Sequence, residues 1–471
     1  MNQPLQLKDH KQIGQELELF FTNDIAPGAP FWLPKGMIIF KELEKYIREL
    51  TSKAGYQETS TPIMVKSELF KQSGHWDKFG VEAGVKEVYG GHGMYNLPIY
   101  DDEEIEEHLR SIERGKPSSD LLVHILPSGN KQYMPKVNYS LKPMNCPEST
   151  LIYRFKTRSY KDLPLRLSEI GRLHRREKSG EVNGLLRVRQ ITMDDAHIYA
   201  TEDQIFSEIN NILDMMITFY KNFGFEFDFR LATRPEKFAG TKENWEKAEK
   251  ELEKALKTKK LKYSMKDQDG AFYGPKIDVH IKDSLGREWQ LATVQLDFHQ
   301  PEAFKLSYVD NEGKEQRPVM IHRAIFGSFE RFIGILTEHY QGVFPLWLSP
   351  VQVMIMPITD KQDEHAKKIV EELREFGIRA ELDNRPERLQ AKIRDSSLQK
   401  VPYLGIIGDK EVKSSPARQR VRSQAKSGGK LKVQSYGEHL ISIRTRSGKD
   451  LGQIKLSDFL NKLREEIDKK I

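Results

Sequence analysis

The sequence has only one cysteine, Cys146, among its 471 residues. A single cysteine cannot close an internal disulfide, and this composition suits a reducing compartment. No apolar run approaches the roughly 20 residues that a membrane-spanning helix needs. The first ten residues have neither the apolar core of a signal peptide nor the Arg- and Ser-rich pattern of a transit peptide. We therefore expect a cytoplasmic protein without a membrane segment.

Acidic residues are missing from the stretch between Lys413 and Lys432, which holds seven basic ones. Such a stretch is either a flexible solvated loop or an electrostatic contact for a phosphate backbone. The whole chain has a formal net charge of +6 and a pI near 8.9. This mild basic excess is compatible with a polyanionic partner, but many cytosolic enzymes carry as much.

The chain is too long for one ordinary hydrophobic core, so two or more domains are expected. Up to residue 339, short strand-like runs alternate with helical periodicity. This mixture predicts an α+β domain built on an antiparallel sheet. The expected strands lie within residues 165–200, 279–281 and 293–298, and the expected helices lie at 37–50, 204–223 and 326–339.

Pro345 and Pro350 mark a change of pattern. After them, three buried-type strands (351–358, 378–382 and 403–407) alternate with helical segments, which predicts a small α/β domain with a parallel sheet. We expect domains at residues 1–348 and 349–471. A solvated insertion interrupts the first at about 80–137, and a basic insertion interrupts the second at about 413–438.

Three short residue patterns occur in sequence along the first domain. Pro62 ends an extended segment, Arg175-Arg176-Glu177 precedes a loop, and Gly327-Ser328-Phe329-Glu330-Arg331 opens a helix. Each pattern arises readily by chance in a chain this charged. In this order and spacing they resemble motifs 1, 2 and 3 of class II aminoacyl-tRNA synthetases.

Seven further segments, five between these motifs and two in the C-terminal block, carry a more specific pattern: 142–147, 194–197, 270–276, 294–298, 319–323, 408–412 and 443–450. They resemble one family, the threonyl-tRNA synthetases. The resemblance implies a class II catalytic domain and an anticodon-binding domain, which together activate threonine with ATP and transfer it to the 3′ end of tRNA(Thr). It also implies a homodimer built around motif 1.

The resemblance also implies one zinc ion per chain. By themselves, Cys146, His197 and His322 lie 51 and 125 residues apart, without the close spacing of a structural zinc finger, and could equally be core or surface residues. All three fall inside the family's ligand-bearing motifs. Three protein ligands leave one coordination position open for substrate. The implied zinc binds the amino group and the hydroxyl of L-threonine, so valine should be rejected.

Five residues match the family's ATP site. Arg175 would contact the α-phosphate and the threonine carboxylate, because a guanidinium can serve two oxygens at once. A surface arginine paired with Glu177 is the alternative. Arg331 would cover the adenine and Arg187 the outer phosphates, with Glu177 near the adenine amino group. Gln290 completes the set, and Mg²⁺ should accompany the phosphates, held largely by ATP and water.

Five further residues match the family's threonine site. Asp195 would hydrogen-bond the threonine hydroxyl, and Met144, Tyr273, Lys276 and Gln295 would line the pocket.

His75, in Ser73-Gly74-His75-Trp76, matches the histidine proposed to assist transfer to tRNA. It could accept the ribose proton or only position the ribose. In the C-terminal domain, Glu411 and Arg444 match residues that read anticodon bases, which is sensible chemistry for unstacked RNA. Their alternative is an exposed ion pair.

The sequence departs from the family at several points. Met193 replaces a glutamine, Pro386 replaces an asparagine among the anticodon contacts, and Glu148-Ser149 replaces Gly-His after Pro147. No N-terminal editing domain is expected and no His-x-x-x-His pair occurs. Since serine lacks only a methyl group, we expect mischarging that a separate trans-editing protein corrects.

Three other functions are weaker. Prolyl-tRNA synthetase shares the architecture but not the Cys/His/His set. A non-catalytic tRNA- or mRNA-binding paralogue would not need Arg175, Glu177 and Arg331 together. A zinc hydrolase would need a general base beside a local ligand pair, which the sequence does not offer.

Overall fold

The computed structural model describes residues 7–76, 92–99, 123–125, 131–133, 137–178, 180–283, 286–413 and 439–470. The chain divides into two compact units. Residues 22–30 and 47–335 form the large-sheet unit, and residues 1–21, 31–46 and 336–471 form the small-sheet unit. The domain boundary after residue 348 stays a prediction. Most of the insertion at 80–137, and residues 414–438 of the basic insertion, lie outside the described residues.

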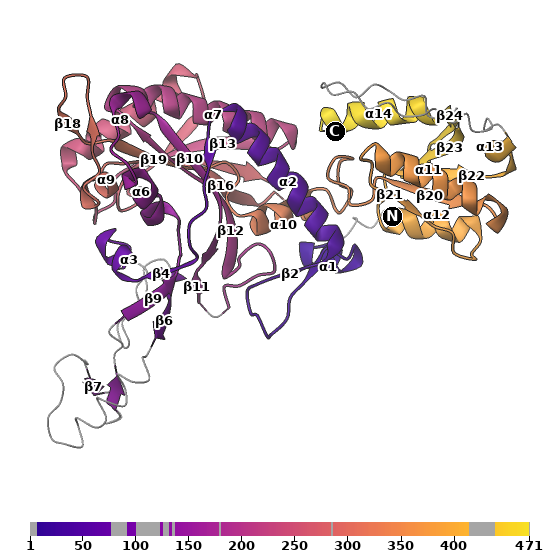
Figure 1. The fold of residues 1–471 in the computed structure, drawn as a ribbon, viewed down its shortest axis with the longest axis horizontal. Helices are drawn as coiled ribbons and strands as arrows, with labels where there is room; N and C mark the ends of the chain where they lie inside the picture. Colours follow the sequence, from indigo (N-terminus) through magenta and orange to yellow (C-terminus); the bar gives the residue numbers. More distant parts are fainter. Residues whose placement is uncertain are drawn as a thin grey trace. The chain divides into compact units, whose positions relative to one another are not determined.

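The large-sheet unit is built on an eight-stranded sheet (Figure 1). All pairs between its inner strands are antiparallel, as predicted, and only the two outermost pairs are parallel. In spatial order the strands are β14 (Tyr263–Lys266), β13 (Glu226–Ala232), β15 (Lys276–Lys282), β16 (Glu288–Asp297), β19 (Val319–Ala324), β12 (Gln190–Ala200), β10 (Leu165–His174) and β3 (Gln57–Glu58).

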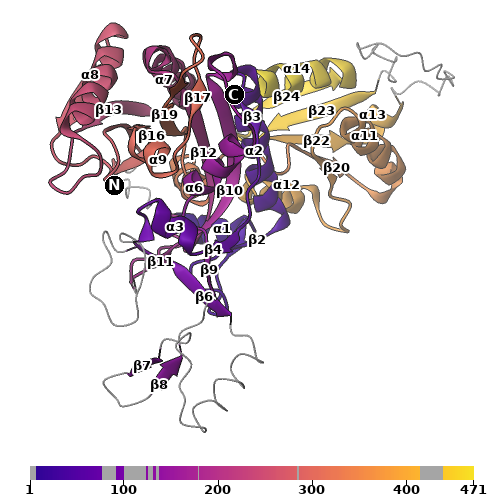
Figure 2. The ribbon, with the colours of Figure 1, turned by 60° about the vertical axis from the view of Figure 1, so that its left-hand side comes forward.

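Two helices, α7 (Ile205–Asn222) and α8 (Lys242–Thr258), contact each other and the strands β13, β15 and β16. Figure 2 shows them beside this sheet. Helix α7 matches the helix predicted at 204–223. The sequence analysis missed α8, because charged residues surround its narrow buried face of Trp245, Ala248, Leu252, Ala255 and Leu256. Apolar residues alternate with polar ones along β16, so one face of the sheet is left for polar side chains.

Helices α2 (Pro34–Lys53) and α10 (Phe329–His339) each contribute residues to both units. The remaining short elements are α1 (His10–Glu16), β1 (Phe20–Phe21), β2 (Phe31–Trp32), β4 (Met64–Lys66), α3 (Glu68–Gln72), β5 (His92–Gly93), β6 (Tyr95–Ile99), β7 (Val123–Ile125), β8 (Lys131–Tyr133), β9 (Val137–Leu141), α6 (Cys146–Arg154), η2 (Tyr160–Asp162), β11 (Arg176–Glu177), η3 (Glu202–Gln204), α9 (His299–Ala303), β17 (Tyr308–Val309) and β18 (Glu315–Gln316).

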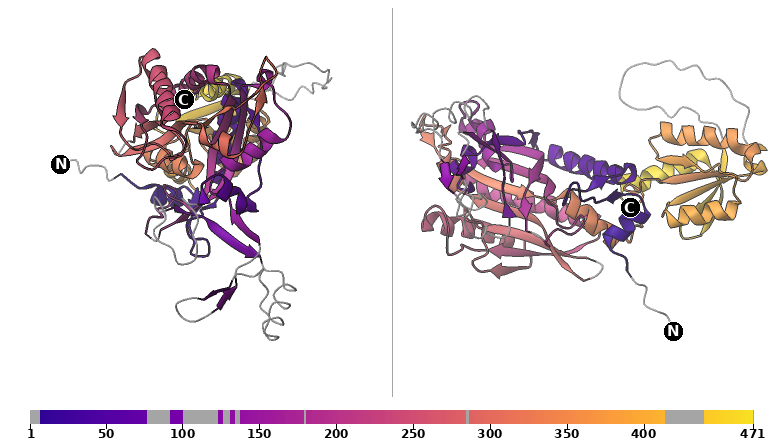
Figure 3. Two further views of the ribbon diagram at one scale, coloured as in Figure 1. Left: turned by 90° about the vertical axis from the view of Figure 1, so that its left-hand side faces the viewer. Right: turned by 90° about the horizontal axis from the view of Figure 1, so that it is seen from below.

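The small-sheet unit contains a five-stranded sheet with helices on both faces (Figure 3). Strands β21 (Ala380–Leu382), β20 (Val353–Pro357) and β22 (Tyr403–Ile407) are parallel, as predicted. Strands β23 (Leu440–Thr445) and β24 (Asp450–Lys455) add antiparallel pairs, so the predicted parallel sheet is mixed. Helices α11 (Asp363–Glu375) and α14 (Leu456–Asp468) share one core, and α12 (Leu389–Leu398) packs on the other. The unit also includes η4 (Asp360–Gln362) and α13 (Asp409–Lys413).

None of the helices in the described part of the chain combines the length and the apolar character that crossing a membrane requires.

Candidate active site

Four of the predicted site residues form one row across the large sheet. His197 on β12 lies opposite His322 on β19, and His322 lies opposite Gln295 on β16. Gln295 in turn pairs with Lys276 on β15. Side chains directly opposite each other on neighbouring strands project from the same face of a sheet. The register alone therefore gathers neighbours in the row that are 19, 27 and 125 positions apart along the chain.

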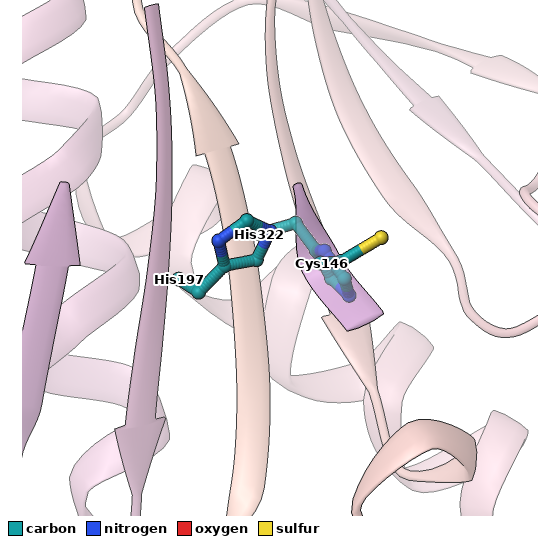
Figure 4. Close-up of side chains that lie close together, drawn as sticks. All are labelled: Cys146, His197 and His322. Atoms are coloured by element: carbon teal, nitrogen blue, oxygen red, sulfur yellow. The ribbon is translucent and has the colours of Figure 1, made fainter. Parts of the chain in front are cut away.

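Cys146 joins the two histidines of this row from the first position of α6. Its sulfur and one nitrogen of each histidine lie within 4.8 Å of one another, and all three side chains are buried (Figure 4). In a tetrahedral zinc site, Zn–S bonds of about 2.3 Å and Zn–N bonds of about 2.0–2.1 Å place ligand atoms roughly 3.3–3.6 Å apart. A shift of about 1 Å would close the cluster to that geometry. The donor set therefore fits zinc, with one position open.

Burial dominates the electrostatics of this metal cluster. Loss of water raises the pKa of the Cys146 thiol well above its ordinary range, with a smaller contribution from the charge of Asp195. The same loss lowers the pKa of His197. A neutral imidazole is the form that binds metal, and a bound divalent cation would reverse the effect on the thiol by favouring the thiolate.

The residues predicted for threonine surround the metal cluster. The Tyr273 hydroxyl donates to Gln295 Oε1 at 2.5 Å, and the Tyr273 ring lies 5.0 Å from that of His322. The Asp195 carboxylate accepts from Asn145 Nδ2 at 3.0 Å, and desolvation raises its pKa to about 6. Lys276 is paired with the buried Asp278 at 2.7 Å. Met144, two residues before Cys146, is buried in the same core cluster as Cys146.

The five residues predicted for ATP line one cavity of about 320 Å³, the arginine pocket. It contains three arginines, while its remaining wall is formed largely by apolar side chains. The predicted residues are Arg175, Glu177, Arg187, Gln290 and Arg331, and the other lining residues include Leu186, Val188, Ile191, Met193, Leu291 and Phe326.

Backbone carbonyls hold two of these arginines in place. Arg175 Nε donates to Pro143 O at 3.1 Å, and Arg331 Nε donates to Leu186 O at 2.9 Å. Burial lowers the pKa of both guanidinium groups. The buried Glu177 pairs with Arg187, whose Nε lies 3.0 Å from Glu177 Oε2. The pocket thus presents positive charge at low solvent exposure, which suits a polyphosphate.

His75 lies beside the metal cluster. Its Nε2 is 4.0 Å from the Cys146 sulfur, and its Nδ1 is 2.8 Å from Ser73 Oγ. The side chain is buried, and desolvation, followed by the charge of His322, lowers its pKa to about 3. The imidazole is therefore neutral at pH 7.

The two residues predicted to read the anticodon lie in the small-sheet unit. Glu411 on α13 accepts hydrogen bonds from Gly408 N at 2.9 Å, Ser442 Oγ at 2.8 Å and Gln453 Nε2 at 2.6 Å. Arg444 on β23 lies 3.9 Å from Asp450. The structure places both at the β22–β23 side of the sheet but pairs each with a different partner.

The positions that depart from the family pattern have distinct surroundings. Met193 lines the arginine pocket. Glu148 is 2% exposed, its two carboxylate oxygens have no hydrogen-bond partner among the described residues, and desolvation raises its pKa to about 8. Pro386 lies between β21 and α12.

Sequence reasoning missed the residues that hold the site residues in place. Asn145 contacts Asp195, and the buried Asp297 lies 2.9 Å from His322 Nε2. Both residues fall inside segments 142–147 and 294–298, which carry the family resemblance. Their supporting roles were not predicted, because a carboxylate or amide that holds another side chain shows no characteristic spacing in the sequence.

Two family models match the chain. Residues 132–340 match the class II core domain of tRNA synthetases for G, H, P, S and T, and residues 352–466 match an anticodon binding domain. With the antiparallel sheet and the arginine pocket, these matches define a class II aminoacyl-tRNA synthetase core joined to an anticodon-binding domain.

Within this class of synthetases, the similar proteins are threonine–tRNA ligases and threonyl-tRNA synthetases. The threonine–tRNA ligases of Clostridium tetani and Clostridium novyi are 44% and 45% identical over 464 and 463 residues, covering 98% of this chain and 62% of each relative. A solved structure of the RNA binding domain of threonyl-tRNA synthetase from Cryptosporidium parvum Iowa II has a TM-score of 0.79 and 32% identity, covering 98% of both chains. The crystal structure of putative threonyl-tRNA synthetase ThrRS-1 from Aeropyrum pernix shares the fold, with a TM-score of 0.69, 24% identity and coverage of 98% of this chain and 97% of that one.

The chain belongs to the threonyl-tRNA synthetase family. It spans about 62% of the length of the curated relatives it matches.

Proposed function

We propose that this chain is a threonine–tRNA ligase that activates threonine with ATP and transfers it to the 3′ end of tRNA(Thr). The observation that carries the proposal is that the arginine pocket and the metal cluster meet on one sheet. Arg175 connects them, because it lines the pocket and donates to Pro143, three residues before Cys146. The proposed sites for ATP and threonine are thus adjacent.

In the activation step, a threonine carboxylate oxygen attacks the α-phosphorus of ATP. The new P–O bond forms the adenylate, and the bond to the β-phosphate oxygen breaks to release pyrophosphate. Arg175 is proposed to neutralise the two approaching anions, and Arg187 to bind the outer phosphates. Arg331 and Glu177 are proposed to hold the adenine, and Gln290 to complete the site. Mg²⁺ would be carried mainly by ATP.

Cys146, His197 and His322 are proposed to hold zinc. When bound, zinc would act as a Lewis acid toward the threonine amino group and hydroxyl, which together need one ligand more than a four-coordinate site provides. Asp195, held by Asn145, would accept the hydroxyl proton as a hydrogen bond. Tyr273, Gln295, Lys276 and Met144 would enclose the rest of the amino acid.

His75 is proposed to act in the transfer step. Its low pKa and buried position favour the positioning role over the role of a general base, because an imidazole with a pKa of about 3 binds a proton weakly at pH 7. Glu411 and Arg444 are proposed to contact anticodon bases. A homodimer is proposed on family grounds.

One assay separates this function from its rivals: ATP–pyrophosphate exchange with threonine, serine, valine and proline, before and after zinc removal. The proposal predicts exchange with threonine, weaker exchange with serine, almost none with valine, and loss of exchange without zinc. Exchange with proline would indicate prolyl-tRNA synthetase activity. A properly folded chain that supports exchange with none of the four would indicate the non-catalytic tRNA- or mRNA-binding alternative.

A further inference from the structure

Asp297, the last residue of β16, contacts one residue of the metal cluster. Its carboxylate is fully buried, and its Oδ2 lies 2.9 Å from His322 Nε2. An ionised carboxylate can only accept a hydrogen bond, so Nε2 must carry the imidazole proton. The lone pair of a neutral His322 is then on Nδ1. That nitrogen is the one left to bind a metal.

The Asp297 carboxylate is itself fixed in orientation. Its Oδ1 accepts the backbone N–H groups of His299 at 2.7 Å and Gln300 at 2.9 Å. The Gln300 side chain donates to Oδ2 at 3.3 Å. Because both oxygens are engaged, the carboxylate cannot turn away from His322 without losing hydrogen bonds in a buried place.

Gln300 adds to this restraint. Its side chain is fully buried against the Asp297 carboxylate, so the amide that donates to Oδ2 has little freedom to move. A short stretch of chain, residues 297–300, therefore holds the carboxylate that faces His322.

We propose that Asp297 and Gln300 form a positioning pair that presents Nδ1 of His322 to one zinc ion. The inference rests on the proposed zinc site. Supporting carboxylates of this kind fix the ring orientation and the tautomer of metal-binding histidines, and their loss typically weakens metal binding about 10–100-fold.

The test compares zinc affinity, measured by chelator competition on the full chain, for the parent and for Asp297→Asn. The asparagine has the same shape but can present an NH₂ group to Nε2, so the tautomer is no longer fixed. We expect zinc to bind about 10–100-fold more weakly. The cobalt-substituted protein should also change its visible absorption spectrum, which reports ligand geometry independently of activity.

Asp283→Asn is the matched control. Asp283 is equally buried as a side chain, and it accepts from Arg287 N at 2.9 Å and from Trp289 Nε1 at 2.8 Å, but it contacts no cluster residue. Its zinc affinity should equal that of the parent. Gln300→Leu tests the second member with an apolar side chain of similar size, and should weaken zinc binding less than Asp297→Asn.

The zinc-loaded parent provides a test that needs no variant. Its crystal structure should show Nδ1 of His322 on the metal. Ligation through Nε2, or full zinc affinity in a folded Asp297→Asn protein, would overturn the pair. If the parent binds no zinc, the zinc site itself fails and the pair fails with it, whereas zinc binding unaffected by either substitution overturns the pair alone.

Discussion

Arg175 is the residue on which the proposed activation step depends most. The half-buried Arg175 lines the arginine pocket, and its Nε donates to Pro143 O. Arg175→Ala should lower the rate of threonine-dependent pyrophosphate exchange about 10²–10³-fold, the usual loss when one pre-placed donor to a developing charge is removed. The exchange rate of Arg175→Lys should lie between those of the parent and of Arg175→Ala, because lysine keeps the positive charge but lacks the paired N–H donors of a guanidinium. Arg172→Ala, at an exposed position on β10, should leave the rate unchanged.

Replacing Glu411 should weaken tRNA charging without affecting threonine activation. In Glu411→Gln, threonine-dependent exchange should be unchanged, while kcat/KM for tRNA falls about 10- to 100-fold, as expected for one base contact of about 1–3 kcal/mol. Exposed Glu465→Gln, on α14, is the control. Equal effects on exchange and on tRNA charging would mean that Glu411 only stabilises its unit through Ser442 and Gln453.

At this scale, the sequence could supply residue types but not their partners. The sequence analysis left Arg175 with Glu177 open as a surface pair, and the structure pairs Glu177 with Arg187. For Glu411 and Arg444 an exposed ion pair was the alternative, but Glu411 contacts Gln453 and Arg444 lies near Asp450. Charged side chains are long and reach several alternatives, so spacing does not decide between them.

The segment between β14 and β15 depends on Gly274. A Cβ atom built there would lie 1.8 Å from the carbonyl oxygen of Leu296 on β16, so any side chain must push the segment away from the strand. Tyr273 and Lys276, on either side, would move with it. Gly274→Ala should raise the KM for threonine at least about 10-fold, since catalytic geometry is sensitive to shifts near 1 Å.

The affinity for ATP provides the internal control for this variant. The arginine pocket is lined by other segments, so ATP binding, measured by calorimetry, should be unchanged in Gly274→Ala. An unaltered KM for threonine would show that Tyr273 and Lys276 do not enclose the amino acid.

Among the elements, those with clear periodicity were predicted and those without it were not. Strand β22 matches its predicted bounds, and α7 differs by a single residue at each end. Strands β23 and β24 escaped notice because exposed and half-buried residues prevail along them, as is common for strands near a sheet edge. Because these two strands were not predicted, the sheet was expected to be parallel, whereas it is mixed.

For the whole molecule, the sharpest expectation concerns serine. Serine keeps the hydroxyl that the proposed zinc site recognises, and one methyl group is worth about 1–3 kcal/mol, or roughly 10–200-fold. The purified chain should therefore form Ser-tRNA measurably, and we propose that a separate protein removes it. The measurement is charging of tRNA(Thr) with labelled serine, followed by its release. Hydrolysis of Ser-tRNA by this chain alone would contradict the proposal.

Family resemblance supplied most of what was anticipated for the molecule as a whole. The antiparallel sheet followed from the pattern of strands and helices, but the convergence of Cys146, His197 and His322 did not. Their separations of 51 and 125 residues carry no signal of proximity, because strand pairing, and not sequence distance, brings them together.

The cross-strand row has a consequence for how such a chain can change in evolution. Inserting one residue into β12, β16 or β19 ahead of the row would turn the following side chains to the opposite face, exchanging a histidine or glutamine for an apolar neighbour. Insertions ahead of the row in these strands must therefore add an even number of residues if the same side chains are to stay on the same face. The one irregularity in this part of the sheet, between Val279 and His280, lies beyond Lys276 and spares the row. By the same reasoning, an insertion that follows the row in a strand leaves the side chains of the row in place.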